Sequence, residues 1–163
     1  MSKLYQKTIF EAVKISGIGL HTGLSSEIKI LPSLANTGII FKRIDLTKNN
    51  IVKASCFNVP SARLCTTLEN NFGVKVSTVE HLLAALYIKG IDNALIEINN
   101  EEVPIMDGSA EKFLDILKNV KIKVLPEKRK FLKVIEKIEL IEGEKTISLE
   151  PNDDTLEVEF QLN

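Results

Sequence analysis

Short runs of alternating apolar and polar residues fill most of the first half of the chain, and this pattern predicts β-strands. The runs are rich in β-branched residues, and turn-forming sequences separate them at residues 33–38 and 47–50. We expect strands at residues 8–15, 26–30, 38–44, 51–57, 62–68, 74–76, 93–98 and 120–125.

Two other segments repeat apolar residues every three or four positions, as one face of an α-helix does. The first covers residues 78–89, and its apolar face is formed by Val79, Leu82, Leu83 and Leu86. Gly90 follows as a signal for the end of this helix. The second covers residues 110–119 after the expected N-cap Ser109, and its apolar face is formed by Phe113, Leu114 and Leu117.

Several strands, two helices and no regular β-α-β alternation predict an α+β fold, in which the helices pack against a largely antiparallel sheet. The composition then changes at residues 126–130, where a proline precedes four charged residues. We expect a first α+β domain at residues 1–125, a linker at residues 126–130 and a second domain that begins within residues 131–163. A solvated loop inside one domain is the alternative interpretation of residues 126–130.

The sequence after the expected linker contains only strand patterns. We expect these strands at residues 131–141, 146–149 and 156–162. Three strands without a covering layer rarely bury enough apolar surface to fold alone. We therefore expect the second domain to be incomplete in this chain.

The composition is that of an ordinary globular protein, and it narrows the classes of partner. The 163 residues are 44% apolar and 26% charged with a net charge of −1, whereas a nucleic-acid-binding protein more often has a clear basic excess. No secretory signal and no stretch of about 18 apolar residues occurs. The two cysteines, Cys56 and Cys65, suit free thiols in a reducing compartment. We therefore expect a cytoplasmic protein with no nucleic-acid partner and no transmembrane segment, and the sequence leaves its oligomeric state open.

The adjacent pair Glu80–His81, in the segment STVEHLLAAL (residues 77–86), has two interpretations. In the first, Ser77 and Glu80 form a capping box, in which each side chain accepts a hydrogen bond from the other residue's backbone N–H. In the second, the pair is catalytic and His81 is a metal ligand. Spacing alone gives a metal site little support, because no H-E-x-x-H motif occurs and His21 and the cysteines have no recognisable ligand spacing with His81.

The glycine-rich segment GIGLHTG (residues 17–23) does not match a dinucleotide-binding loop, because its third glycine comes one residue late and a strand pattern follows. It is typical of a sharp turn between two strands, with His21 presented on the turn rather than buried. The segment EVPIMDGS (residues 102–109) has ordinary turn and helix-capping chemistry around Asp107. Cys65 is expected to be a small buried residue in a strand.

Four motifs occur in order along the chain: GIGLHTG (residues 17–23), CTTL (residues 65–68), STVEHLLAAL (residues 77–86) and GIDNALIEINNEEVPIMDGSA (residues 90–110). Together they closely resemble the bacterial UDP-3-O-acyl-N-acetylglucosamine deacetylase family of lipid A biosynthesis. The resemblance is close through residue 125 and looser beyond it. It implies a zinc-dependent hydrolase that removes the N-acetyl group of UDP-3-O-acyl-N-acetylglucosamine, built from two similar α+β domains with the active site between them.

The resemblance also implies roles for individual residues. In the family's VEH motif the His is a zinc ligand, and the preceding Glu is the general base that activates water at the zinc. These roles fall on His81 and Glu80. The glycine turn and the CTTL segment lie near the site in the family, so the implied substrate contacts are Leu20, His21, Leu64 and Cys65.

The sequence departs from the family's pattern at the remaining zinc ligands. In the family these are a His and an Asp of a later His-Lys-x-x-Asp motif, and this chain has no His after His81. We therefore expect an N-terminal portion of the enzyme, a fragment that lacks the other zinc ligands and is inactive alone. The alternative is a non-catalytic α+β module that binds a ligand or a protein partner.

Overall fold

The fold comes from a computed structural model of the chain, which describes residues 4–153 and 156–161. The chain forms two compact units, Met1–Arg129 and Lys130–Asn163. Within residues 4–153 and 156–161, no helix has the length and apolar character needed to cross a membrane.

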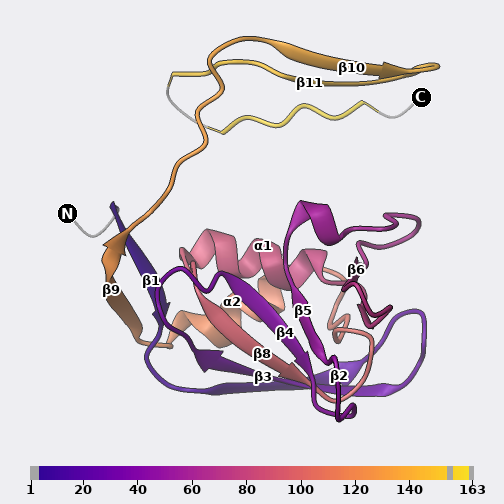
Figure 1. The fold of residues 1–163 in the computed structure, drawn as a ribbon, viewed down its shortest axis with the longest axis vertical. Helices are drawn as coiled ribbons and strands as arrows, with labels where there is room; N and C mark the ends of the chain where they lie inside the picture. The colour runs from indigo at the N-terminus through magenta and orange to yellow at the C-terminus, as the bar shows by residue number, and fades with distance from the viewer. Residues whose placement is uncertain (1–3, 154–155, 162–163) are drawn as a thin grey trace. The chain divides into compact units, whose positions relative to one another are not determined.

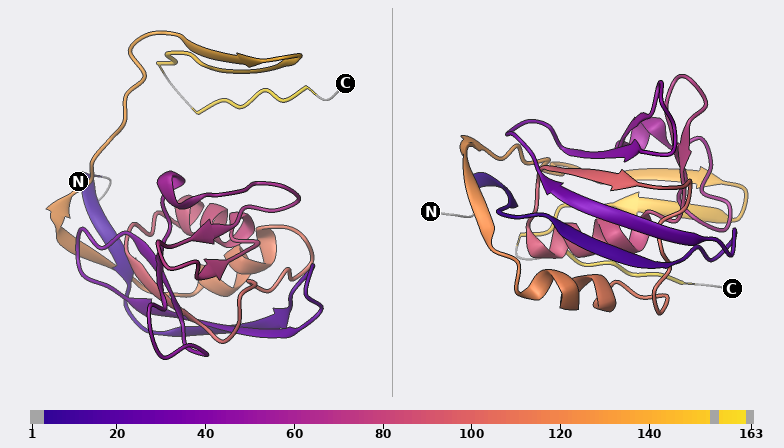
Figure 2. Two further views of the ribbon diagram at one scale, coloured as in Figure 1. Left: turned by 45° about the vertical axis from the view of Figure 1, so that its right-hand side comes forward. Right: turned by 90° about the horizontal axis from the view of Figure 1, so that it is seen from below.

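The first unit is built on a five-stranded sheet with both helices on one of its faces (Figure 1, Figure 2). In spatial order the strands are β2 (Val13–Ile18), β3 (Ser25–Pro32), β8 (Ala94–Ile98), β4 (Ile39–Arg43) and β5 (Ile51–Lys53). Neighbouring strands are antiparallel except β8 and β4, which run parallel. The helices are α1 (Glu80–Lys89) and α2 (Glu111–Lys118). The predicted α+β fold is confirmed.

Two short pairs of strands and a 3₁₀-helix complete the first unit. Strand β1 (Tyr5–Ile9) pairs with β9 (Ile122–Lys128), and β6 (Leu68–Glu69) pairs with β7 (Lys75–Val76). The 3₁₀-helix η2 spans Cys56–Asn58. Along the chain, η2, β6 and β7 lie between β5 and α1, in the region that contains the CTTL motif and leads into the VEH motif.

The second unit contains one hairpin among its described residues, in which β10 (Ile138–Glu142) pairs with β11 (Lys145–Leu149). Every residue of both strands is exposed. A single hairpin has no second layer against which to bury its side chains, so it contributes little apolar burial.

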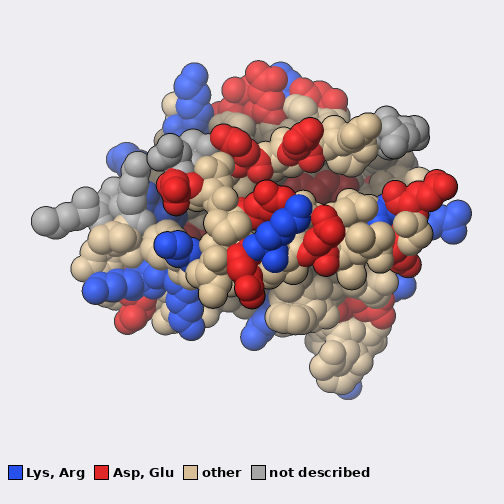
Figure 3. Space-filling view, turned by 90° about the horizontal axis from the view of Figure 1, so that it is seen from above, with Lys and Arg blue, Asp and Glu red and all other residues tan. Residues whose placement is uncertain are grey.

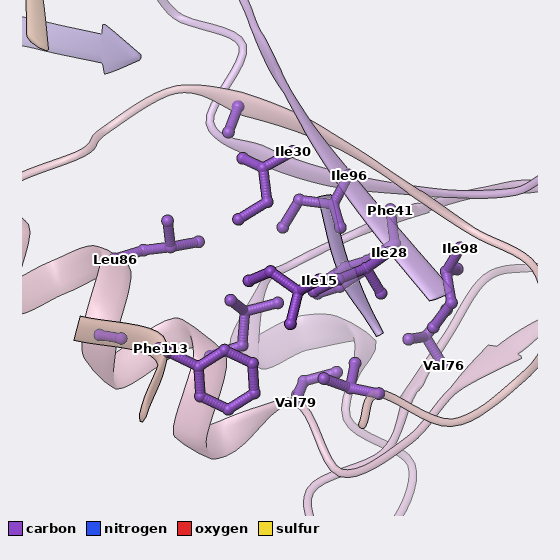
Figure 4. Close-up of a cluster of buried hydrophobic side chains, with 14 of the residues drawn as sticks. Ile15, Ile28, Ile30, Phe41, Val76, Val79, Leu86, Ile96, Ile98 and Phe113 are labelled. Atoms are coloured by element: carbon purple, nitrogen blue, oxygen red, sulfur yellow. The ribbon is translucent and has the colours of Figure 1, made fainter. Parts of the chain in front are cut away.

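One apolar core lies between the five-stranded sheet and the two helices (Figure 4). Strand β3 contributes Ile28 and Ile30, which are paired with Ile98 and Ile96 of β8. The helices contribute Leu82, Ala85, Leu86, Phe113 and Leu117. Burial of each large side chain contributes roughly 1.5–3 kcal/mol. This core therefore fixes the start of α1 relative to the sheet.

Both predicted helices are confirmed. Along α1 the predicted apolar face packs on the core, and Gly90 ends the helix with a φ of 73°, in the left-handed region that glycine adopts without strain. The N-cap of α2 is Ala110 rather than the expected Ser109. The Ser109 hydroxyl still accepts from the Glu111 N–H at 3.1 Å.

The single strand expected at residues 8–15 is wrong, because the chain forms two strands there. The first, β1, ends at Ile9, and β2 begins at Val13. The Phe10 N–H donates to the Lys121 carbonyl at 2.8 Å, so Phe10 extends the pairing between β1 and β9 by one hydrogen bond. The chain then bends and joins the five-stranded sheet through β3.

The strands expected at residues 51–57 and 62–68 are also too long. Strand β5 ends at Lys53, because the Ser55 side chain accepts from the Phe57 N–H and starts the 3₁₀-helix η2. At residues 62–68 the backbone turns at Leu64, whose φ is 67°, and strand β6 begins only at Leu68. Alternation of apolar and polar residues corresponds to a strand only where the backbone stays extended, and η2 and the turn at Leu64 interrupt it here.

Toward the end of the chain, β9 continues through residues 126–128, which were expected to be linker. Lys128 pairs with Tyr5, and the Arg129 N–H donates to the Leu4 carbonyl, so pairing with the N-terminal segment extends this strand. The strand expected at residues 131–141 is shorter and begins at Ile138. Residues 156–161 form no strand, and residue 162 of that expected strand lies outside the described residues. The proposed domain boundaries stay a prediction.

Charges of both signs are interspersed on the face shown in Figure 3. This matches the net charge of −1. The shortest ion pair in the described part of the chain joins Arg43 to Asp45 at 2.6 Å, and Arg129 lies 2.8 Å from Asp92.

Candidate functional site

Glu80 and His81 are the first two residues of α1, and both side chains are half-buried. The Glu80 carboxylate accepts a hydrogen bond through Oε2 from the Thr66 N–H at 3.1 Å. Thr66 belongs to the CTTL segment, which lies 14 residues before Glu80. The structure therefore brings the CTTL segment against the start of α1.

The capping-box interpretation of Ser77 and Glu80 is wrong. The N-cap position is Val79, and no side chain caps the helix. The Ser77 hydroxyl donates to the Glu101 carbonyl at 3.1 Å, and the Ser77 N–H donates to the same carbonyl at 2.8 Å. Ser77 is thus paired with the segment after β8, which leaves the Glu80 carboxylate available for the CTTL segment.

A buried carboxylate, Glu102, lies at the centre of the hydrogen bonds around these motifs. Its side chain is fully buried. Oε1 accepts from the His21 N–H at 2.9 Å and from the Thr78 hydroxyl at 2.9 Å. Oε2 accepts from the Thr22 N–H at 2.8 Å and from the Thr22 hydroxyl at 2.7 Å. Glu102 therefore joins the turn at residues 17–23 to Thr78, which lies two residues before the start of α1.

The turn at residues 17–23 is shaped to approach this carboxylate. It connects β2 to β3, as expected, and Gly23 has a φ of 65°. A Cβ atom on Gly19 would overlap Oε2 of Glu102 and the Thr22 hydroxyl. Glycine at position 19 is therefore required for this close approach of backbone to side chain.

The hydrogen bonds to Glu102 set its pKa. Burial alone would raise the pKa, but the hydrogen bonds from His21, Thr22 and Thr78 outweigh burial and lower it to about 2. The carboxylate is consequently charged at neutral pH. Among the residues that the structure describes, N–H and O–H donors rather than a cation compensate its charge.

We predict that Glu102 makes the protein sensitive to acid. Its pKa is about 2 in the folded protein and near 4.5 when unfolded, so its contribution is complete above pH 4.5 and is lost as the pH falls toward 2. Between pH 5 and pH 3 the free energy of unfolding should fall by roughly 2 kcal/mol from this group alone. Urea unfolding at both pH values measures it.

The control for the acid prediction is the variant Glu102→Gln, which cannot ionise. Asp45 and Asp107, whose pKa values are also lowered by hydrogen bonds, are present in both proteins and cancel in the comparison. The variant should be less stable at pH 7 and should lose less stability on acidification. Equal losses in the two proteins would contradict the lowered pKa.

Backbone strain is concentrated in the motif segments. Within the described residues, three bulky residues have a positive φ, namely Leu64 (67°), Thr78 (56°) and Met106 (58°). The other two residues other than glycine with a positive φ are asparagines, which tolerate this region. Strain of this kind costs about 1–3 kcal/mol at each residue and is commonly found at functional sites. The three segments that carry it contain or flank the CTTL, VEH and PIMD motifs.

The remaining residues implied by sequence lie on or near the surface. Leu20 and Leu64 are 58% and 83% exposed and take no part in the hydrogen bonds around Glu102. The His21 side chain is exposed while its N–H binds Glu102. Cys65 lies in a bend rather than a strand and is half-buried, with its Sγ 3.7 Å from the Thr67 hydroxyl.

Sequence reasoning missed Glu102. The signal that could have found it is an acidic residue directly before the apolar run Val103–Met106, which enters the core at Val103. Its partners are 24 to 81 positions away in the sequence. Local pattern alone does not reveal such partners.

No metal centre is complete within the described residues. Among residues 4–153 and 156–161, no three His, Cys, Asp or Glu side chains are arranged to hold a metal ion. His81 offers one imidazole at the start of α1. Imidazole nitrogen is a common zinc ligand, and a catalytic zinc normally takes three protein ligands.

Comparison with known proteins gives consistent matches over nearly the whole chain. The sequence model described as LpxC, UDP-3-O-acyl N-acetylglycosamine deacetylase, matches residues 6–163. Proteins named UDP-3-O-acyl-N-acetylglucosamine deacetylase are similar to this chain. One from Shewanella frigidimarina is 41% identical over 148 residues, which is 91% of this chain and 48% of that protein.

Two further relatives with the same name give the same result. The protein of Pseudoalteromonas atlantica is 40% identical over 158 residues, covering 97% of this chain and 52% of that protein. The protein of Geotalea uraniireducens is 45% identical over 148 residues, covering 91% of this chain and 48% of that protein. The chain therefore spans about half the length of the curated relatives it matches.

Proposed function

Because this chain belongs to the UDP-3-O-acyl N-acetylglycosamine deacetylase family, we propose that its protein removes the N-acetyl group of UDP-3-O-acyl-N-acetylglucosamine in lipid A biosynthesis. The observation that carries the proposal is the family match over residues 6–163. We further propose a cytoplasmic location, which the free thiols of Cys56 and Cys65 fit.

His81 is the residue that we propose as a zinc ligand. It fits one position of a zinc site by chemistry and by its place on the first turn of α1, and the described residues do not complete the site. We propose that the other ligands come from the half of the family's length that this chain does not cover. Zinc, when bound, would act as a Lewis acid toward the amide carbonyl and lower the pKa of water toward ~7.

Glu80 is the residue that we propose as general base. The Thr66 N–H binds one of its oxygens at 3.1 Å and fixes the carboxylate at the start of α1. A carboxylate has about four acceptor positions, so further positions remain with which it can take a proton from water. The first turn of a helix is a position at which acidic side chains interact favourably with the helix dipole. Neighbouring residues on a helix diverge by about 100°, so Glu80 and His81 address different points of one site.

We also propose substrate contact for four residues near the start of α1, of which three are exposed and Cys65 is half-buried. His21 and Leu20 lie on the turn that Glu102 holds, and Leu64 and Cys65 precede Thr66, which binds Glu80. Loop residues on a rigid scaffold are common binding residues.

The proposed function is tested by assaying the complete gene product. With UDP-3-O-acyl-N-acetylglucosamine it should release acetate and the free amine in equal amounts. The isolated 163-residue chain should release none and hold no stoichiometric zinc, because its described residues do not complete a metal site. Chromatographic separation of substrate from amine measures turnover, and elemental analysis measures zinc.

Three outcomes would count against the proposed function. A zinc-loaded complete protein that releases no acetate would overturn the deacetylase proposal. Binding of the substrate without its hydrolysis would favour the binding-module alternative. Turnover or one tightly held zinc in the isolated chain would overturn the proposal that the other ligands lie outside it.

A further inference from the structure

Three segments that are far apart in the sequence meet at the side chain of Glu102. They are the turn at residues 17–23, residues 77–78 before α1, and the loop at residues 102–108. We propose that Glu102 is a positioning residue, which holds the turn and the start of α1 in one arrangement. This inference rests on the proposed function, because the groups it positions are those proposed for the deacetylation site.

The geometry requires a charged acceptor at this position. The four donors that face the carboxylate are the N–H groups of His21 and Thr22 and the hydroxyls of Thr22 and Thr78. A carboxylate only accepts, so it can satisfy all four, whereas a glutamine amide would turn an NH₂ donor toward at least one of them. A buried donor that is left unpaired destabilises the folded protein. Replacement by glutamine therefore displaces a segment rather than preserving the network.

The path from Glu102 to the proposed general base runs through Thr78. This residue has a φ of 56°, which is strained for a β-branched side chain, and its hydroxyl donates to Oε1 at 2.9 Å. Backbone bonds fix the same place, because the Val103 N–H donates to the Ser77 carbonyl at 3.1 Å. Glu80 follows Thr78 by two residues. The direction in which α1 starts is therefore set at Glu102.

Glu102 acts through these residues and not on substrate. Its side chain is fully buried, whereas His21, whose N–H it binds, presents its imidazole to solvent. The bond from Thr22 to the same carboxylate holds the next residue of the turn. Loss of Glu102 should consequently disturb the placement of catalytic groups without removing any of them.

The experiment compares variants of the complete gene product in the deacetylation assay. Glu102→Gln should lower kcat by about 10- to 100-fold, the scale expected when reacting groups are misplaced by about 1 Å, and should change KM less than threefold. The matched control is Glu101→Gln, since Glu101 is the exposed neighbour. It should keep kcat within twofold of the wild type.

A second pair of variants keeps the test decisive if Glu102→Gln does not fold. Thr78→Val removes the hydroxyl donor and keeps the branched shape, and Thr78→Ser keeps the hydroxyl. We expect kcat to fall about tenfold in Thr78→Val and to stay within threefold of the wild type in Thr78→Ser. A purely structural role would lower the unfolding temperature without this split in kcat.

Several results would overturn the inference. One is a folded Glu102→Gln variant whose kcat is within threefold of the wild-type value. Another is an equal loss of kcat in Thr78→Val and Thr78→Ser. If the wild type itself releases no acetate, the proposed function fails, and amide NMR spectra of the same proteins test the positioning role alone. Thr78→Val should then shift the Glu80 and His21 amide resonances, and unchanged resonances would overturn it.

Discussion

Replacement of Glu80 by glutamine should lower kcat of the complete gene product by about 10² to 10⁴, the contribution of a positioned general base. Glutamine has nearly the same shape and keeps a carbonyl oxygen that can accept from the Thr66 N–H, now at 3.1 Å from the carboxylate. It cannot take a proton from water at neutral pH. We therefore expect zinc content and the unfolding temperature to stay close to the wild-type values.

Glu111→Gln is the matched control for this variant. Glu111 is the first residue of α2, as Glu80 is of α1, so both substitutions remove an acidic residue from the first turn of a helix. We expect kcat of Glu111→Gln to equal that of the wild type within twofold. A Glu80→Gln protein that is folded, holds zinc and keeps its kcat would refute the assignment of Glu80 as general base.

Replacement of His81 by glutamine should remove the zinc. Loss of residues that merely orient a metal ligand costs about 10- to 100-fold in affinity, so loss of a ligand itself should cost at least about 100-fold. Dialysed His81→Gln protein should therefore hold far less than one zinc per chain and release no acetate. Elemental analysis after dialysis measures the first effect independently of activity.

His21→Gln is the matched control, because His21 and His81 are the only histidines of the chain. The His21 imidazole is exposed on the turn at residues 17–23, and its proposed role is substrate contact. We expect this variant to keep its zinc and to change KM. Zinc loss in His21→Gln with retention in His81→Gln would reverse the assignment.

The helix that carries the pair could be predicted because its stability is encoded locally. The apolar residues along α1 repeat with the helical period and pack on the core, and Gly90 ends the helix in the left-handed conformation. Strand β3 could be predicted for the same reason, since the buried residues Ile28 and Ile30 alternate with polar residues along it. Periodicity thus determines which face of each element is buried.

The details of the site could not be predicted, because distant contacts decide them. Ser77 and Glu80 have the spacing of a capping box, yet Ser77 binds Glu101 and Glu80 binds Thr66. Strand pairing was expected across Leu64, where the backbone instead has a φ of 67°. In each case a tertiary hydrogen bond or a local turn outweighed the preference that the short sequence pattern indicates.

The same limit explains why Glu102 was missed and why the roles of Glu80 and His81 rest on resemblance. The donors to Glu102 come from the turn at residues 17–23 and from Thr78, which local sequence does not connect. Within the described residues, His81 belongs to no group of three or more potential metal ligands, so no spacing of ligands could identify a metal site.

The most direct test of the proposed site is an anomalous difference map at the zinc edge, from crystals of the complete gene product. We expect one peak at about 2.0–2.1 Å from a ring nitrogen of His81, with the Glu80 carboxylate beside it. A zinc peak with no bond to His81, or an active protein whose crystals contain no zinc, would contradict the assignment.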